Sequence, residues 1–143
     1  MAKLHSLRSW LALAMLIVNA AGCKGSPAPQ AEHEEAETLA RTEFTDRIEN
    51  FFEYEALKAG QPSQFRIHLT DLSDGFPVEK AEVTLTARSE GKPPVETLAR
   101  VGKVTGIYVA DLALPSAGAY EIEFHIRNAK VDERLHLRGF EVE

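Results

Sequence analysis

From about residue 50 onward, apolar and polar residues alternate in short segments along the chain. In the clearest segment, 117–127, charged residues alternate with four apolar residues: Tyr120, Ile122, Phe124 and Ile126. An alternation with a period of two places the apolar side chains on one face of a β-strand and the polar side chains on the other. The pattern therefore predicts a half-buried strand in this segment.

Six further segments show the same kind of pattern, although it is weak in the fourth. They are residues 50–55, 64–72, 82–88, 96–101, 106–115 and 133–143. Turn-forming residues such as Gly60 and Pro62 separate them, and Gly139 is expected to form a bulge in the last one. About seven short strands without a helical crossover predict an all-β protein, an immunoglobulin-like antiparallel β-sandwich over residues 44–143.

The alternation also predicts which side chains form the core of the sandwich. In addition to the four apolar residues of 117–127, the expected core residues are Phe65, Ile67, Leu69, Val83, Leu85, Ala87, Tyr108, Ala110, Leu112, Leu135, Leu137, Phe140 and Val142. Glu121 and Glu123 are expected on the opposite face, in contact with solvent.

The start of the chain has a different pattern. Residues 10–18 are uninterrupted apolar, and Lys3 and Arg8 precede them without an acidic residue. A nine-residue helix reaches only about 14 Å, which is short against about 30 Å of membrane hydrocarbon. Together with the small residues at 20–22, this pattern predicts a secretory signal peptide over residues 1–22.

Cys23 is the only cysteine of the chain and follows the small residues directly. This arrangement resembles the bacterial lipobox, in which a signal peptidase cuts before a cysteine that carries acyl chains. The lipobox prefers leucine where this chain has Ala20. The resemblance implies that Cys23 is lipidated, and several acyl chains on one residue anchor a protein stably to a membrane. The alternative is an unmodified thiol near an ordinary cleavage site. Lys24 in place of aspartate favours the outer membrane under the enterobacterial sorting convention.

Residues 23–43 are rich in proline, alanine and glutamate and poor in large apolar residues. They are expected to form a flexible tether, with room for one helical turn in 31–41. Without Lys3 and Arg8, the chain keeps 14 basic and 22 acidic residues, a net charge of −8. This charge disfavours nucleic acid and anionic lipid headgroups as partners.

No nucleophile motif and no phosphate-binding glycine loop occurs in the sequence, so we expect a protein that is not an enzyme and has no cofactor. Three histidines, His68, His125 and His136, fall on the polar faces of predicted strands. Imidazoles on neighbouring strands could together bind zinc or copper. The interpretation that we favour is three separate solvent-facing histidines, because their spacing does not place them together.

Residues 50–88, NFFEYEALKAGQPSQFRIHLTDLSDGFPVEKAEVTLTAR, carry a more specific signal. They resemble a segment near the N-terminus of periplasmic adaptor (membrane-fusion) subunits of RND-type heavy-metal efflux pumps. The matching residues are Leu57, Ala59, Gly60, Pro62, Ser63, Phe65, His68, Leu69, Thr70, Leu72, Ser73, Asp74, Pro77 and Val78. Residues 106–124 are similar to the closing hairpin of the same module.

The resemblance covers about residues 45–143 and implies a β-sandwich that takes part in metal efflux. Such adaptors continue into a helical hairpin, a lipoyl-like domain and β-barrels, whereas this sequence ends at Glu143. We expect either a stand-alone relative of the module or a truncated adaptor.

The expected function is therefore a lipid-anchored, non-enzymatic binding module on the periplasmic side of the cell envelope. Its expected partners are the membrane, through Cys23, and efflux-pump or other envelope proteins. One alternative is a periplasmic metal-binding protein that uses the strand histidines. Another is a structural subunit of an envelope complex.

Overall fold

A computed structural model of the protein describes residues 37–143. The predicted signal peptide, Cys23 and the first part of the predicted tether lie outside these residues. The described part consists of strands and their connections, and none of it forms a helix long and apolar enough to cross a membrane.

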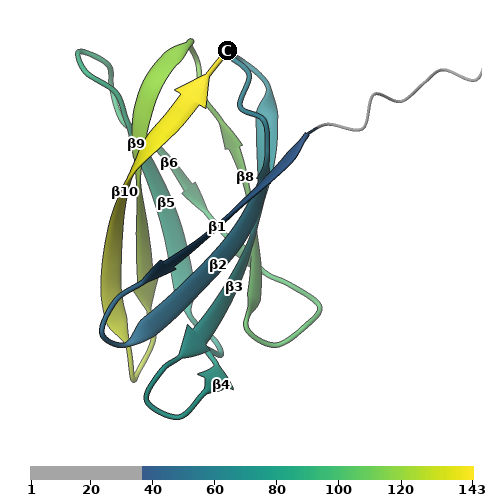
Figure 1. Ribbon diagram of the computed structural model, residues 1–143, viewed down its shortest axis with the longest axis vertical. Helices are drawn as coiled ribbons and strands as arrows, with labels where there is room; N and C mark the ends of the chain where they lie inside the picture. The colour runs from purple at the N-terminus through teal and green to yellow at the C-terminus, as the bar shows by residue number, and fades with distance from the viewer. Residues whose placement is uncertain (1–36) are drawn as a thin grey trace, which may run out of the picture. The chain divides into compact units, whose positions relative to one another are not determined.

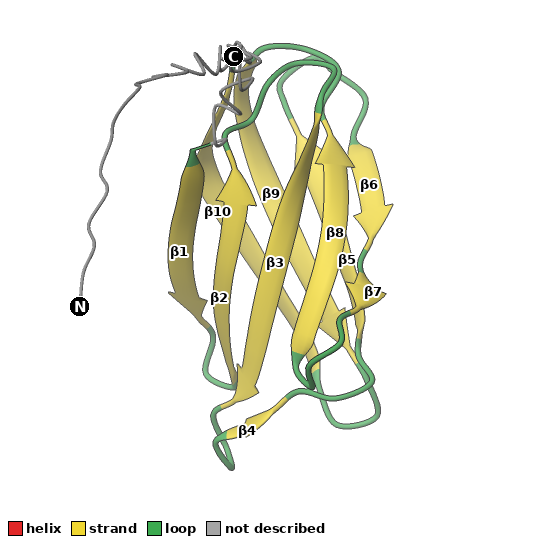
Figure 2. Ribbon diagram, turned by 90° about the vertical axis from the view of Figure 1, so that its right-hand side faces the viewer, coloured by secondary structure: helices red, strands yellow, loops and turns green. Residues whose placement is uncertain are grey.

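The strands form two antiparallel sheets that face each other (Figures 1 and 2). The first sheet has the order β1-β2-β3-β8-β7, with β4 paired to β3. Its strands are β1 (Thr38–Phe44), β2 (Ile48–Glu55), β3 (Pro62–Asp71), β4 (Phe76–Pro77), β7 (Arg100–Val101) and β8 (Ile107–Ala113). The second sheet has the order β10-β9-β5-β6. Its strands are β5 (Glu82–Arg88), β6 (Val95–Leu98), β9 (Gly118–Arg127) and β10 (Asp132–Val142).

This strand order is that of an immunoglobulin-like sandwich. Strands β2-β3-β8-β7 correspond to A-B-E-D, and β10-β9-β5-β6 correspond to G-F-C-C′. Tyr120 at the start of β9 adds the tyrosine corner of such folds, because its hydroxyl donates to the carbonyl oxygen of Ser116 at 3.1 Å. The predicted fold class is confirmed.

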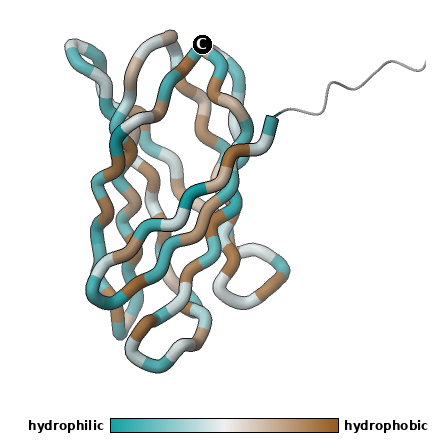
Figure 3. Tube along the Cα trace, viewed as in Figure 1, coloured by the Kyte–Doolittle hydropathy of each residue, from teal (hydrophilic) through white to brown (hydrophobic). Residues whose placement is uncertain are grey.

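The predicted core is confirmed as well. Every core residue predicted from the alternation is buried, and hydrophobic and hydrophilic positions alternate along the strands in Figure 3. Aromatic rings fill the centre: the centroid of the Phe52 ring lies 4.8 Å from that of Phe124, and the Phe65 ring stacks on Tyr54 at 5.0 Å. The predicted bulge is also present, because the register of β10 against β9 shifts across Gly139.

One predicted strand is wrong. Residues 96–101 are divided between β6 in the second sheet and β7 in the first. Ala99 lies between them, and its buried amide donates to the carbonyl oxygen of Val83 at 2.8 Å. This bond holds the chain where it crosses from one sheet to the other, so a continuous strand cannot form. The six other predicted strands are found within two residues of their expected bounds.

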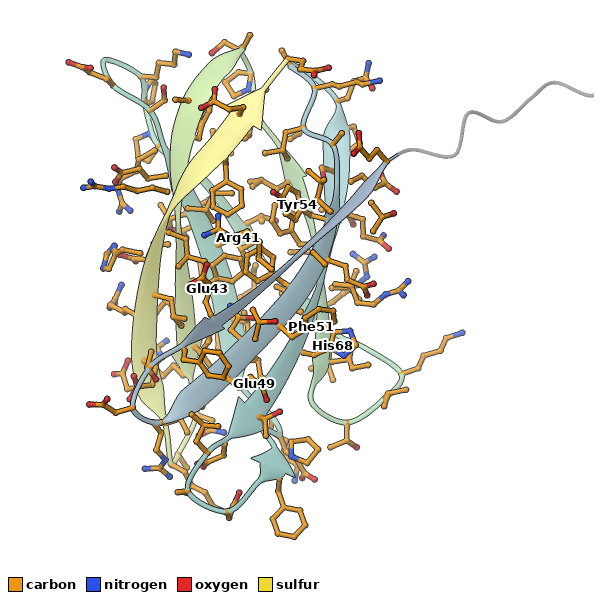
Figure 4. The ribbon with its side chains drawn as sticks, viewed as in Figure 1. Arg41, Glu43, Glu49, Phe51, Tyr54 and His68 are labelled. Atoms are coloured by element: carbon orange, nitrogen blue, oxygen red, sulfur yellow. The ribbon has the colours of Figure 1, made fainter. Side chains whose placement is uncertain are left out.

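The predicted end of the tether also requires correction. Residues 38–43 belong to β1, which pairs with β2 over its full length, so neither a tether nor a helical turn is present there. The alternation does not reveal this strand, because its inward positions carry charged residues. Arg41 donates to Glu43 at 2.6 Å and to the carbonyl oxygen of Arg138 at 2.8 Å. Its guanidinium lies 4.8 Å from the ring centroid of Phe140, so the side chain closes the seam between β1 and β10 (Figure 4).

The two ends of the described chain lie at the same end of the sandwich (Figure 2). Glu37 accepts a bond from the amide of Ala56, and the amide of Glu143 donates to Leu57. We call the opposite end the loop end. It comprises the connections 45–47, 72–81, 102–106 and 128–131 (Figures 1 and 2).

Candidate functional site

The loop end contains a groove of about 550 Å³. One wall is the segment from the end of β3 to the start of β5, and the other is the turn between β9 and β10. The residues that line the groove are Asp71, Asp74, Phe76, Pro77, Val78, Glu79, Lys80, Asn128, Ala129, Lys130 and Val131. Its volume lies within the range of about 300–1,000 Å³ that is usual for ligand sites.

An ion pair fixes the start of the first wall. Asp71 accepts bonds from Arg47 at 3.0 and 3.1 Å, and from the amide and hydroxyl of Ser73 at 2.9 and 2.6 Å. The hydrogen bonds from the Arg47 guanidinium, followed by those from Ser73, hold the pKa of Asp71 far below its ordinary value. The carboxylate therefore stays ionised and keeps the turn after β3 in place.

Tyr108 fixes the other end of this wall. Its buried hydroxyl donates to the carbonyl oxygen of Val78 at 2.7 Å and accepts from the amide of Ala81 at 3.0 Å. Burial raises the pKa of Tyr108, so the hydroxyl keeps its proton for this bond. Between the two anchored residues, Lys80 has φ of 50°, a left-handed conformation that is rare for a residue other than glycine. Such strain persists only where the surrounding structure enforces it.

Asn128 connects the two walls. Its side-chain oxygen accepts from the amides of Lys130 and Val131 at 2.8 and 2.9 Å, which shapes the turn between β9 and β10. Its side-chain nitrogen donates to the carbonyl oxygen of Glu79 at 2.9 Å, on the facing wall. The groove is therefore held open in one shape by hydrogen bonds from both sides.

A third segment packs beside the first wall. Gly106 has φ of 79°, and a Cβ atom there would lie 2.5 Å from Cβ of Pro77. Only glycine allows this close approach, which brings the segment 102–106 against the wall. At the edge of the groove, the side chain of Phe76 is 68% exposed. A fixed groove beside an exposed aromatic side chain is suited to binding a partner.

Replacing Tyr108 with phenylalanine is expected to lower the free energy of unfolding by about 1–3 kcal/mol, because Val78 and Ala81 lose their buried hydrogen-bond partner. Urea denaturation of a soluble form that starts at residue 34 measures this loss. Tyr54→Phe is the matched control, since the buried Tyr54 makes no hydrogen bond through its hydroxyl within residues 37–143. Equal losses in the two variants would contradict the anchoring role of Tyr108.

The three histidines do not lie together. His68 projects from the outer face of the first sheet, where its ring packs edge-on against Phe51 at 5.2 Å (Figure 4). His125 and His136 lie on the outer face of the second sheet, on the opposite side of the sandwich. Two packed sheets are about 10 Å apart, so one ion cannot reach all three imidazoles. Within residues 37–143, no group of three or more histidine, cysteine or acidic side chains is arranged to hold a metal ion.

His125 and His136 each contact a carboxylate instead. The Nε2 atom of His125 lies 2.8 Å from Asp132, and the Nδ1 atom of His136 lies 3.2 Å from Glu123. Glu123 also accepts a bond from Arg134 at 2.7 Å. These contacts form a cross-strand charge network on β9 and β10.

Glu123 differs from the expectation for its face of the strand. It does point away from the core, as predicted, but it is buried rather than solvated. Arg134 and His136 on β10 contact its carboxylate, and Arg88 on β5 approaches it to 4.0 Å. Longer side chains on both neighbouring strands therefore cover it. Alternation gives the face on which a side chain lies, but not what its neighbours cover.

The sequence did not identify the groove. Residues 73–81 contain turn-forming residues such as Gly75 and Pro77, and nothing in residues 128–131 distinguishes them from an ordinary turn between strands. The one available signal was Phe76, a large aromatic residue within turn-forming residues. Comparisons of the chain with models of known protein families and with curated proteins found no match.

Proposed function

We propose that this protein is a lipid-anchored, non-enzymatic binding module of the bacterial cell envelope, and that its loop end contacts other envelope proteins. The observation that carries the proposal is the groove between residues 71–80 and 128–131, with the exposed Phe76 at its edge. Loops at one end of a β-sandwich commonly carry binding functions, because the sheets hold them in fixed positions.

The orientation of the domain supports the same function. The loop end lies opposite the end at which residue 37 joins the preceding chain (Figure 2). A strand of ten residues such as β3 is about 33 Å long, so an anchor attached before residue 37 leaves the groove directed away from the point of attachment. A partner can then reach the groove without contact with the anchored end.

We propose more specifically that this binding module takes part in cation efflux. The resemblance to RND adaptor subunits supports this link. Several residues that carry this resemblance build the loop end. Leu69 accepts the bond from the amide of Val78, Ser73 donates to Asp71, and Asp74 accepts from the amide of Phe76. The similar residues therefore include those that shape the groove as well as those of the core.

The test is photo-crosslinking in the host cell, with the full chain and a benzophenone-bearing amino acid at position 76. We expect crosslinks to a second envelope protein, identified by mass spectrometry as a component of a cation-efflux system. Position 98 is the matched control, because Leu98 is exposed to 64% and lies on β6, away from the groove. Equal yields at both positions, or no crosslinks at position 76, would argue against a binding role for the loop end.

A further inference from the structure

Exposed apolar side chains are concentrated at the loop end. Three of the seven large apolar residues that are exposed within residues 37–143 lie there, Leu72, Phe76 and Val104, and a fourth, Phe44, ends β1 directly before the connection 45–47. They come from three segments, the end of β1, the connection 72–81 and the connection 102–106, so apolar side chains from separate parts of the chain are exposed at this end. Large exposed apolar surfaces of this kind mark sites of association.

Apart from Asp71, the charged residues that line the groove have both signs in equal number. Lys80 and Lys130 line it together with Asp74 and Glu79, and none of the four belongs to an ion pair within residues 37–143. Asp71 also lines the groove, but Arg47 neutralises it. The groove is therefore neutral as a whole, whereas the chain after residue 22 carries a net charge of −8.

The balance of positive and negative charges in the groove favours a second copy of the same chain as the molecule that binds there. Two copies that meet elsewhere bring together surfaces of a net acidic protein, and these surfaces repel each other. In a two-fold arrangement the same patch lies on both sides of the interface, so each lysine can face an acidic residue of the other copy. A patch that carries both signs is complementary to itself in this arrangement.

We propose that two copies of the protein associate through their loop ends, with Phe76 of each copy inserted into the groove of the other. The inference rests on the proposed function, because it assigns an occupant to the same groove. An exposed aromatic residue that enters a preformed pocket is the usual centre of such an interface, and Val78, Ala129 and Val131 supply apolar surface in this groove. The anchored ends of the two copies then lie at opposite ends of the dimer.

Sedimentation equilibrium of the full chain tests this inference, in density-matched detergent with a reducing agent that prevents disulfides through Cys23. We expect a reversible dimer. Phe76→Asp should raise its dissociation constant at least about tenfold, because it replaces the aromatic ring that enters the groove with a charged side chain. Leu98→Asp is the matched control: it adds the same charge at an equally exposed apolar position and should leave the dissociation constant unchanged.

A chain that stays monomeric at every concentration would overturn the inference, and so would a dimer that both variants weaken equally or neither weakens. These failures are distinct from failure of the proposed function. A monomeric chain that still crosslinks from position 76 to a different envelope protein would leave the proposed function intact and exclude the second copy as the occupant.

Discussion

Replacing Phe124 with alanine is expected to lower the free energy of unfolding by about 3–5 kcal/mol. Phe124 is fully buried at the centre of β9, and its ring centroid lies 4.8 Å from that of Phe52 and 6.3 Å from that of Phe65. It pairs with Leu85 and Leu135 within the second sheet, and the Phe52 and Phe65 rings come from the first sheet, so both sheets surround it. Removing the ring leaves a cavity that a close-packed core cannot fill by small shifts.

Urea denaturation of a soluble form that starts at residue 34 measures this loss. Glu121→Ala is the matched control, because Glu121 lies on the same strand, points away from the core and forms a surface ion pair with Arg138. We expect the control to cost less than about 1 kcal/mol. Glu123 does not serve this purpose, because it is buried against Arg134. Similar losses at positions 124 and 121 would show that the register of β9 is wrong.

Replacing Cys23 with alanine is expected to abolish membrane anchoring. If Cys23 is the site of lipidation, the variant carries no acyl chains and remains as an unprocessed precursor or a soluble product. Acyl chains contribute about 0.8 kcal/mol for each buried CH₂ group, so their loss removes the main source of membrane affinity. Phase partitioning in detergent, followed by mass spectrometry of the N-terminus, measures both processing and lipidation.

The matched control for this experiment is Ala20→Leu. It introduces the leucine that the lipobox prefers three residues before the cysteine, so anchoring should be retained or improved. The lipoprotein interpretation fails if processed Cys23→Ala protein still fractionates with membranes.

Most of the sandwich could be predicted from the sequence, because most of its strands are buried on one face only. A period of two is visible wherever the inward positions are apolar, as in β3, β5 and β9. The same rule fails for β1, where Arg41 and Glu43 occupy inward positions. Arg41 can lie there because its guanidinium stacks over Phe140 and donates to the backbone carbonyl of Arg138. Both partners are far away in the sequence, so the alternation of residues 38–44 does not indicate these contacts.

The groove could not be predicted in the same way. Its two walls, residues 71–80 and 128–131, are about 50 residues apart in the chain and meet only because β9 pairs with β5. The histidines show the same limit. Alternation correctly places His68 and His125 on outward faces, but it does not state to which sheet each strand belongs. Sheet membership decides whether such residues can act together.

The pairing of β1 with β2 has a mechanical consequence for an anchored protein. Residue 37 adjoins the end of the hairpin opposite its turn, so a pulling force on the preceding chain separates β1 from β2 one hydrogen bond at a time. Peeling all seven residues would release about 23 Å of chain and move the point of attachment to the loop end, where the connection 45–47 lies. Arg41 lies midway along this path, and its bond to the backbone of Arg138 and its contact with the Phe140 ring resist the peeling there. The contacts of Arg41 across this seam therefore help to keep the groove directed away from the anchored end.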